Sequence, residues 1–198
     1  MGFRRPDWLA ELQGLVTAAL VLLAGIVVFN IVTLADGGVV VAQVPADAVT
    51  GVGGATGGLR DGAVVDGDVE VLVAEPTPRQ LVTYHLTRLP TFAVAGAVLA
   101  LLWTALRRAR RGDPFSAGTV QRLRLIGWVA LVGGILAQLV QMIASLELTS
   151  QVTADGRLSA TQDLGTTGLF LLVGFGFFAI AEILRRGLAL RTELESVI

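Results

Sequence analysis

Residues 15–34 form the first of four long apolar stretches that carry no charged side chain. A helix rises ~1.5 Å per residue, so this stretch covers about 30 Å, the thickness of the hydrocarbon core of a bilayer. Residues 90–106, 125–146 and 164–180 have the same character. The pattern predicts a mainly α fold, a four-helix transmembrane bundle in a single membrane domain of residues 1–198. The spans are expected at about 12–35, 78–107, 117–147 and 164–188.

Between the first two spans the pattern changes to a two-residue alternation. Residues 39–44 are rich in valine, and residues 63–73 place two valine-rich arms around Asp66-Gly67, a dipeptide favoured in tight hairpin turns. Residues 151–160 repeat this arrangement around Asp155-Gly156. These features predict a small extracytoplasmic β-hairpin or sheet element, and they leave open whether the two segments share one sheet. The extracytoplasmic segments are residues 36–77 and 148–163.

The second span is predicted to start ahead of its apolar stretch. Thr77 and Gln80 form a capping-box pair, and Pro78 occupies the first helical position, where its missing amide hydrogen breaks no helical bond. The following turns are amphipathic. Pro90 then predicts a kink where the helix enters the lipid.

The placement of arginine sets the expected orientation, because basic residues near helix ends are retained in the cytoplasm. Arginines gather near both termini and between the second and third spans, so these segments, including the loop at 107–117, are expected to be cytoplasmic. Trp8, Trp103 and Trp128 near the cytoplasmic helix ends agree with an aromatic belt. A cleaved signal peptide is the competing interpretation of the N-terminus. The length of the first apolar stretch favours an uncleaved anchor.

Composition agrees with a membrane protein and narrows the chemistry. Hydrophobic residues make up 54% of the chain and charged residues 16%, and the mean hydropathy is +0.72. All 15 basic residues are arginine, cysteine is absent, and His85 is the single histidine. This composition excludes lysine chemistry, thiol chemistry and two-histidine metal sites. We expect no catalytic residue, no cofactor and no metal, and the net charge of -1 favours no nucleic-acid partner.

The loop between the second and third spans holds the most distinctive motif. Ser116 is placed as the N-cap of the third helix, Phe115 can pack against Val120, and Pro114 holds the preceding chain extended. Clustered arginines precede these residues and are expected to hold the loop on anionic lipid. The cluster comprises Arg107, Arg108, Arg110 and Arg111.

This motif resembles a signature of a bacterial family of small four-span integral membrane proteins, domain-of-unknown-function family 2975. The loop matches at Gly112, Asp113, Pro114, Phe115, Ser116, Arg122, Leu123, Arg124, Ile126 and Gly127. The C-terminal helix matches at Glu182, Arg186, Gly187, Leu190, Arg191 and Glu193. The resemblance implies a multi-pass protein of the bacterial plasma membrane without an assigned activity, and a signalling or regulatory association.

Neutral polar residues share one face of the predicted third span. Gln138, Gln141 and Ser145 follow helical spacing, so they can line a polar path or form hydrogen bonds between helices, for example with Asn30. Interhelical hydrogen bonding is the favoured interpretation, because such bonds serve assembly alone.

Glu182 lies close to the end of the fourth apolar stretch, a position that a proton-coupled transporter would use. Arg185 and Arg186 follow it at the spacings that favour helix ion pairs. The sequence therefore predicts a salt-bridged glutamate at the membrane interface.

Small residues mark places where helices can approach closely. Ala130 and Gly134 lie four residues apart on the third span. The phenylalanine-rich fourth span is expected to face lipid and supply packing bulk, with local flexibility at Gly174 and Gly176.

Together these observations favour a non-enzymatic membrane protein of unknown biochemical activity, a sensor-like or accessory regulatory subunit. The alternative is a small transporter or channel component, motivated by Gln138 and Gln141. An intramembrane enzyme ranks third, since it requires His85 or Glu182 at the floor of a deep polar pocket. The expected partners are the lipid bilayer, with anionic lipid at the basic inner loop, and a second copy of the chain or another membrane protein.

Overall fold

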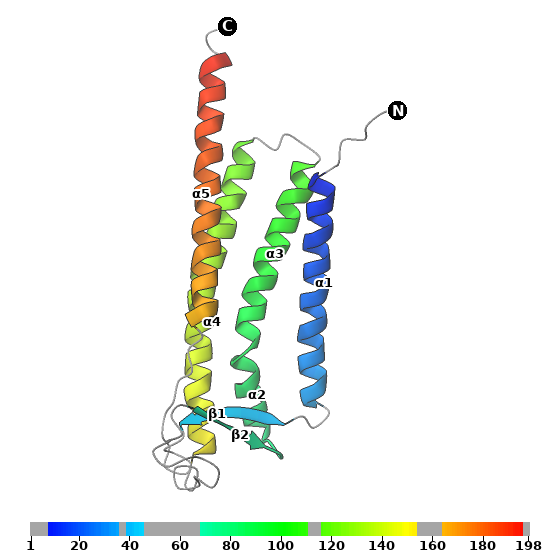
Figure 1. The fold of residues 1–198 in the computed structure, drawn as a ribbon, viewed down its shortest axis with the longest axis vertical. Coiled ribbons are helices and arrows are strands. Elements are labelled where there is room, and N and C mark those ends of the chain that lie inside the picture. The colour runs from blue at the N-terminus through cyan, green and yellow to red at the C-terminus, as the bar shows by residue number, and fades with distance from the viewer. Residues whose placement is uncertain (1–7, 36–38, 46–67, 111–115, 154–163, 196–198) are drawn as a thin grey trace, which may run out of the picture. The chain divides into compact units, whose positions relative to one another are not determined.

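The computed structural model describes residues 8–35, 39–45, 68–110, 116–153 and 164–195. In these ranges the chain is mainly helical and carries one small antiparallel sheet, so the predicted fold class is confirmed. The elements, labelled in Figure 1, are α1 (Trp8–Ala35), β1 (Val40–Pro45), β2 (Asp68–Val73), α2 (Pro78–Leu86), α3 (Leu89–Ala109), α4 (Ala117–Val152) and α5 (Leu164–Glu195).

Four of these helices, α1, α3, α4 and α5, are long and apolar enough to cross a membrane. Most of their side chains are not covered by the protein itself. Only 6% of the most apolar window of α1 is buried, and only 22% of the corresponding window of α4. Burying so large an apolar surface in hydrocarbon is favourable, whereas exposing it to water is not.

The chain falls into two compact units. The helical unit comprises Met1–Val27, Thr91–Ala137 and Leu164–Ile198, and the sheet unit comprises Val28–Pro90 and Gln138–Asp163. Because α4 is continuous from Ala117 to Val152, it contributes residues to both units.

In the helical unit, α1 lies beside α3 (Figure 1). The indole Nε1 of Trp103 donates a hydrogen bond to Thr17 Oγ1 over 3.1 Å, and Arg110 Nη1 donates to Gln13 Oε1 over 2.8 Å. A Cβ at Gly96 would lie 3.4 Å from Leu23 Cδ2, an ordinary packing distance. The contacts between these two helices thus include polar groups near one end of α1.

Helices α3 and α4 enclose the core of the helical unit, against which two residues of α5 also pack. The buried residues of this core are Val98, Ala105, Ile126 and Ala130. Ile126 and Ala130 lie four residues apart on one face of α4, as expected for a helix that buries a single stripe. Val173 and Phe177 of α5 pack against the same cluster.

Helices α4 and α5 approach each other closely through glycine. A Cβ at Gly134 would lie 2.7 Å from Phe170 Cβ, and a Cβ at Gly127 would lie 3.1 Å from the carbonyl oxygen of Gly174. Gly174 itself packs against Leu131, where a Cβ would lie 2.9 Å from Cδ2. The close approach expected at Gly134 is confirmed. Gly174, where local flexibility is expected, is buried in this crossing, and the flexibility itself stays a prediction.

In the sheet unit, β1 and β2 pair antiparallel with Val40 opposite Val73 and Pro45 opposite Asp68. Alternate residues of β1, namely Val40, Ala42 and Val44, are buried together with Tyr84 of α2 and Leu148 of α4. The strand predictions for both segments are confirmed. The turn expected at Asp66-Gly67 and the arm at residues 63–65 lie outside the described residues.

Helix α2 begins as its sequence predicts. The Thr77 hydroxyl accepts from Gln80 N, and Gln80 Oε1 accepts from Thr77 N over 2.8 Å, which completes the capping box. The helix ends at Leu86, and α3 begins at Leu89 with Pro90 as its second residue. The predicted kink is therefore a break between two helices, with the proline in the first turn of the second, where it displaces no helical hydrogen bond.

Helix α4 extends further than the sequence suggests. Gln151 and Val152 were expected in a strand, but they form its last turn, which corrects the predicted hairpin at residues 151–160. Leu148 and Val152, four residues apart, pack against the sheet cluster, and this favours continued helix over a strand. The hydroxyl of Thr153 also bonds to the carbonyl of Thr149. Residues 154–160 of that hairpin lie outside the described ranges, so a shared sheet is not tested.

Candidate functional site

Glu182 on α5 gathers three arginines. Arg185 binds its carboxylate with two nitrogens, Nε at 2.8 Å from Oε2 and Nη2 at 2.7 Å from Oε1. Arg186 Nε donates to Oε1 over 3.0 Å. From α4, Arg124 Nη2 lies 3.6 Å from Oε2. The predicted pairs with Arg185 and Arg186 are confirmed, and the structure adds a partner from a second helix.

This arginine cluster, Arg124, Arg185 and Arg186 around Glu182, carries excess positive charge. Three guanidinium groups share one carboxylate, so two positive charges remain without an acidic partner among the described residues. The arginine side chains are 50%, 59% and 77% exposed, respectively, while that of Glu182 is 34% exposed. The carboxylate therefore holds the arginines in place while leaving most of their surface open.

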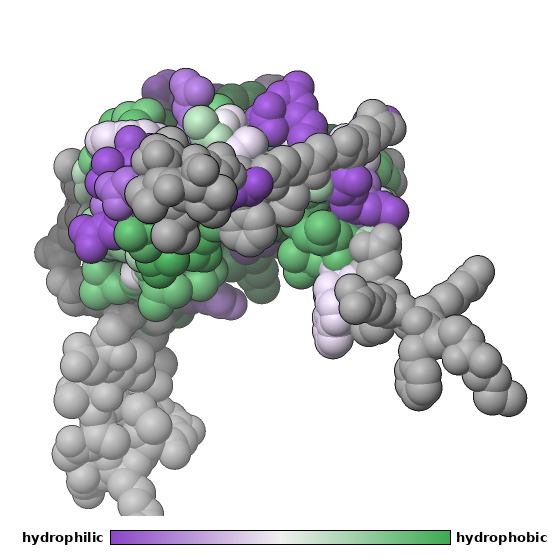
Figure 2. All heavy atoms as spheres, turned by 90° about the horizontal axis from the view of Figure 1, so that it is seen from above, coloured by the Kyte–Doolittle hydropathy of each residue, from purple (hydrophilic) through white to green (hydrophobic). Residues whose placement is uncertain are grey.

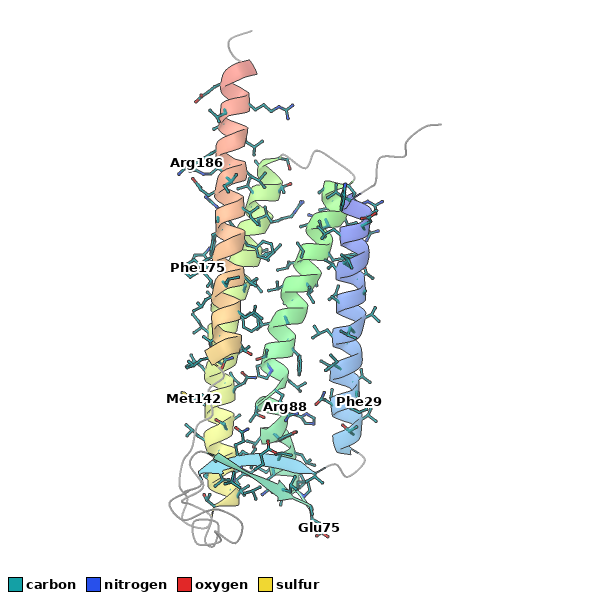
Figure 3. All side chains as sticks on the ribbon, in the orientation of Figure 1. Phe29, Glu75, Arg88, Met142, Phe175 and Arg186 are labelled. Carbon is teal, nitrogen blue, oxygen red and sulfur yellow. The ribbon has the colours of Figure 1, made fainter. Side chains whose placement is uncertain are left out.

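Apolar side chains surround the arginine cluster on the same two helices. Leu125, next to Arg124, is exposed, as are Ile180 and Ile183 on either side of Glu182. Trp128, one turn along α4, meets Phe178 edge to face at 5.5 Å. Figure 3 shows Phe175 and Arg186 projecting from the same helix, α5. Charged side chains and exposed apolar side chains within one helical turn of each other are typical of a membrane–water interface.

The predicted basic loop is only partly described. The Arg107 guanidinium lies over the Trp103 ring, 5.2 Å from its centroid, and Arg110 bonds to Gln13 of α1. Arg108 is exposed at the end of α3. Arg111, Pro114 and Phe115 lie outside the described residues, so the expected packing of Phe115 on Val120 is not tested. Hydrophilic and hydrophobic side chains stand side by side on the face shown in Figure 2.

Ser116 precedes α4, as the N-cap prediction requires, but its side chain bonds differently. Its carbonyl accepts from Thr119 N over 2.9 Å, while its hydroxyl lies 3.1 Å from the Thr119 hydroxyl. The expected hydrogen bond, in which a backbone amide donates to the Ser116 hydroxyl, is therefore wrong. The threonine side chain at the third helical position competes for the serine oxygen.

Replacing Ser116 with alanine should cost less than the ~1 kcal/mol typical of a lost N-cap, because no amide loses its partner. Thr119→Val should cost a similar amount, and the double variant little more than either alone, since both remove one shared hydrogen bond. Unfolding of the four proteins in detergent measures this cycle. Strictly additive losses would contradict the shared bond.

The glutamines expected on one face of α4 have different environments. Gln141 Nε2 donates to the backbone carbonyl of Thr87 over 2.9 Å, at the C-cap of α2, so its predicted interhelical hydrogen bond is confirmed with a backbone partner. Ser145 instead bonds to Met142 in its own helix. The amide nitrogen of Gln138 is buried without a partner, so the hydrogen bond predicted for it is absent.

An ion pair in the sheet unit joins α2 to α4. Arg79 of α2 binds the carboxylate of Glu147, and Gln151 Nε2 donates to the same oxygen over 3.0 Å. Both charged side chains are well exposed, so the pair contributes at most about 1 kcal/mol. The main contribution of this ion pair is to orient the two helices, because it fixes which faces of α2 and α4 meet.

No group of three or more metal-binding side chains lies within the described ranges. His85 is half-buried in the last turn of α2, directly before the break that precedes α3.

Sequence reasoning missed two features of these sites. Arg124 was assigned only to the cytoplasmic loop signature, and nothing near it in sequence indicates a partner on α5. The Thr87 carbonyl was also missed, although a helix break ahead of Pro90 does signal that backbone carbonyls need donors from elsewhere.

Four long apolar helices bury few of their side chains inside the protein. They define a multi-pass integral membrane protein. The family model described as "Protein of unknown function (DUF2975)" matches residues 74–198, and the chain belongs to that family. The match covers both patches on which the resemblance rested. Neither the curated proteins nor the solved structures contain a match to this chain.

Proposed function

We propose that this protein is a non-enzymatic, sensor-like or accessory regulatory subunit of the bacterial plasma membrane. The proposal rests on the observation that α4 is a single helix that supplies buried residues to two separate hydrophobic clusters. Ile126 and Ala130 belong to the core of the helical unit, and Leu148 belongs to the sheet cluster. A continuous helix embedded in both is suited to relay a change at the sheet to the arginine-rich end of the chain.

Polar contacts at each end of α4 support this role. Glu147 binds Arg79 near one end, and Arg124 approaches Glu182 near the other. Each contact joins α4 to a different helix. Exposed ion pairs are weak, so a modest input can exchange one partner for another.

A charge-reversal experiment tests the relay. A fluorophore on a single cysteine at Ala117, an exposed residue at the start of α4, reports on that end in proteoliposomes. Glu147→Arg replaces attraction to Arg79 with repulsion and should change the emission of the fluorophore. The double variant Arg79→Glu with Glu147→Arg restores opposite charges and should restore the emission. Glu70→Gln, an exposed change on β2, serves as the control. An unchanged signal in a folded Glu147→Arg protein would contradict the proposal.

One observation favours the alternative of a small transporter or channel component. The Gln138 amide nitrogen is buried without a partner inside a candidate span, where an unsatisfied donor is costly and often functional. Under this alternative, purified protein in liposomes conducts protons or monovalent ions, and Gln138→Leu abolishes the flux. Absence of flux in the unmodified protein would remove the alternative.

The proposed orientation places both termini and the 107–117 loop in the cytoplasm and the sheet outside. Arginine bias supports it. The chain has no cysteine, so single cysteines can be introduced without background. In intact cells, an impermeant maleimide should label Glu75→Cys, whose parent side chain is exposed (Figure 3), and should spare Arg108→Cys until the membrane is opened. The reverse labelling pattern would invert the model.

A further inference from the structure

We propose that the arginine cluster around Glu182 is a binding site for the phosphate of an anionic lipid headgroup. Arg124 comes from α4, and Arg185 and Arg186 come from α5, so the site bridges two helices. None of these arginines belongs to the 107–111 group, and the proposal does not depend on the proposed relay.

The chemistry of the cluster fits an anion held by several guanidinium groups. Arginine presents five N–H donors in a rigid fork that matches phosphate oxygens. Glu182 engages Arg185 through two nitrogens and Arg186 through one, while Arg124 remains 3.6 Å away, too far for a hydrogen bond. Most donors of Arg124 and Arg186 are therefore available. The glutamate positions the arginines and leaves an excess of two positive charges, which matches an anion rather than a cation.

The surroundings indicate that the anion belongs to a lipid. Exposed Leu125 adjoins Arg124, and exposed Ile180 and Ile183 flank Glu182, so hydrocarbon borders the cluster. Trp128 is also exposed and packs on Phe178 one turn further along. The phosphate of a lipid headgroup can bind the guanidinium groups while the acyl chains of the same lipid lie along these apolar side chains. A free phosphate in water would bind the guanidinium groups alone.

The test is native mass spectrometry of the full chain in non-ionic detergent micelles with equal amounts of phosphatidylglycerol and phosphatidylcholine. The unmodified protein should retain phosphatidylglycerol in preference. Arg124→Gln or Arg186→Gln should each lower its apparent affinity about fivefold, since an arginine near an anionic surface contributes roughly 1 kcal/mol. Arg88→Gln, at an exposed arginine between α2 and α3, is the matched control and should change the affinity less than twofold.

Three outcomes would overturn the proposal. Equal losses at Arg88, Arg124 and Arg186 would mean general attraction without a built site. Unchanged retention in the double variant Arg124→Gln with Arg186→Gln would mean that the cluster holds no lipid. Displacement of the lipid by millimolar inorganic phosphate would assign the site to a soluble phosphate. Unfolding temperatures in lipid-free detergent report whether each variant is folded. If Arg124→Gln does not fold, Arg186→Gln, which changes the most exposed arginine of the cluster, carries the test.

Discussion

Gly174→Ala should lower the free energy of unfolding by about 1–3 kcal/mol, the usual cost of overpacking a tight core. The new Cβ would overlap Leu131, and it would also lie 3.2 Å from the carbonyl oxygen of Gly127. The overlapping atoms include Cγ of Leu131, which rotation about χ2 leaves in place. Either Leu131 must change χ1 within a packed crossing, or helices α4 and α5 must move apart. Reversible unfolding in mixed micelles with increasing dodecyl sulfate measures the loss.

Gly176→Ala is the matched control for this change. It lies two residues along the same helix, and a Cβ there would meet nothing within 4 Å. Alanine favours helix over glycine, so this variant should be neutral or slightly more stable. If both variants lost the same stability, the cause would be the loss of glycine itself, and the close crossing would be contradicted.

Leu148→Ala should destabilise the sheet unit by about 2–5 kcal/mol, the range for removing a buried leucine side chain. Leu148 is only 4% exposed and belongs to the cluster formed with β1 and Tyr84. A two-stranded sheet is marginal by itself, so losing its contact with α4 should release both strands. Amide hydrogen exchange of β1 and β2 should accelerate by at least 10-fold, while exchange in α3 stays unchanged.

Leu72→Ala provides the corresponding control on the strand itself. Leu72 is 68% exposed, so the same truncation leaves no cavity and should change the exchange rates little. Unaltered protection of the strands in Leu148→Ala would show that the sheet is held by something other than α4.

Both predicted losses involve α4. Gly174 of α5 packs against the segment of α4 that belongs to the helical unit, and Leu148 lies on the segment that belongs to the sheet unit. Residues without shared contacts usually contribute additively to stability. Non-additive losses in the double variant would support the relay proposed for α4.

Features that depend on a few neighbouring residues could be predicted from the amino-acid sequence. Uninterrupted apolar stretches predicted the four long helices, valine alternation predicted β1 and β2, and the Thr77–Gln80 spacing predicted the start of α2. The pairs of Glu182 with Arg185 and Arg186 belong to the same group, because positions three and four apart on a helix are always neighbours.

Contacts between residues distant in the sequence became known from the folded structure. A glycine within a helix suggests flexibility, but the structure places Gly174 against Leu131 where α4 crosses α5. The same crossing brings Arg124 to Glu182. The end of α4 also depended on packing, since burial of Leu148 against the sheet favours helix in a segment whose local pattern predicted a strand. Local periodicity specifies an element, whereas its partners and its end follow from the side chains that it buries against other elements.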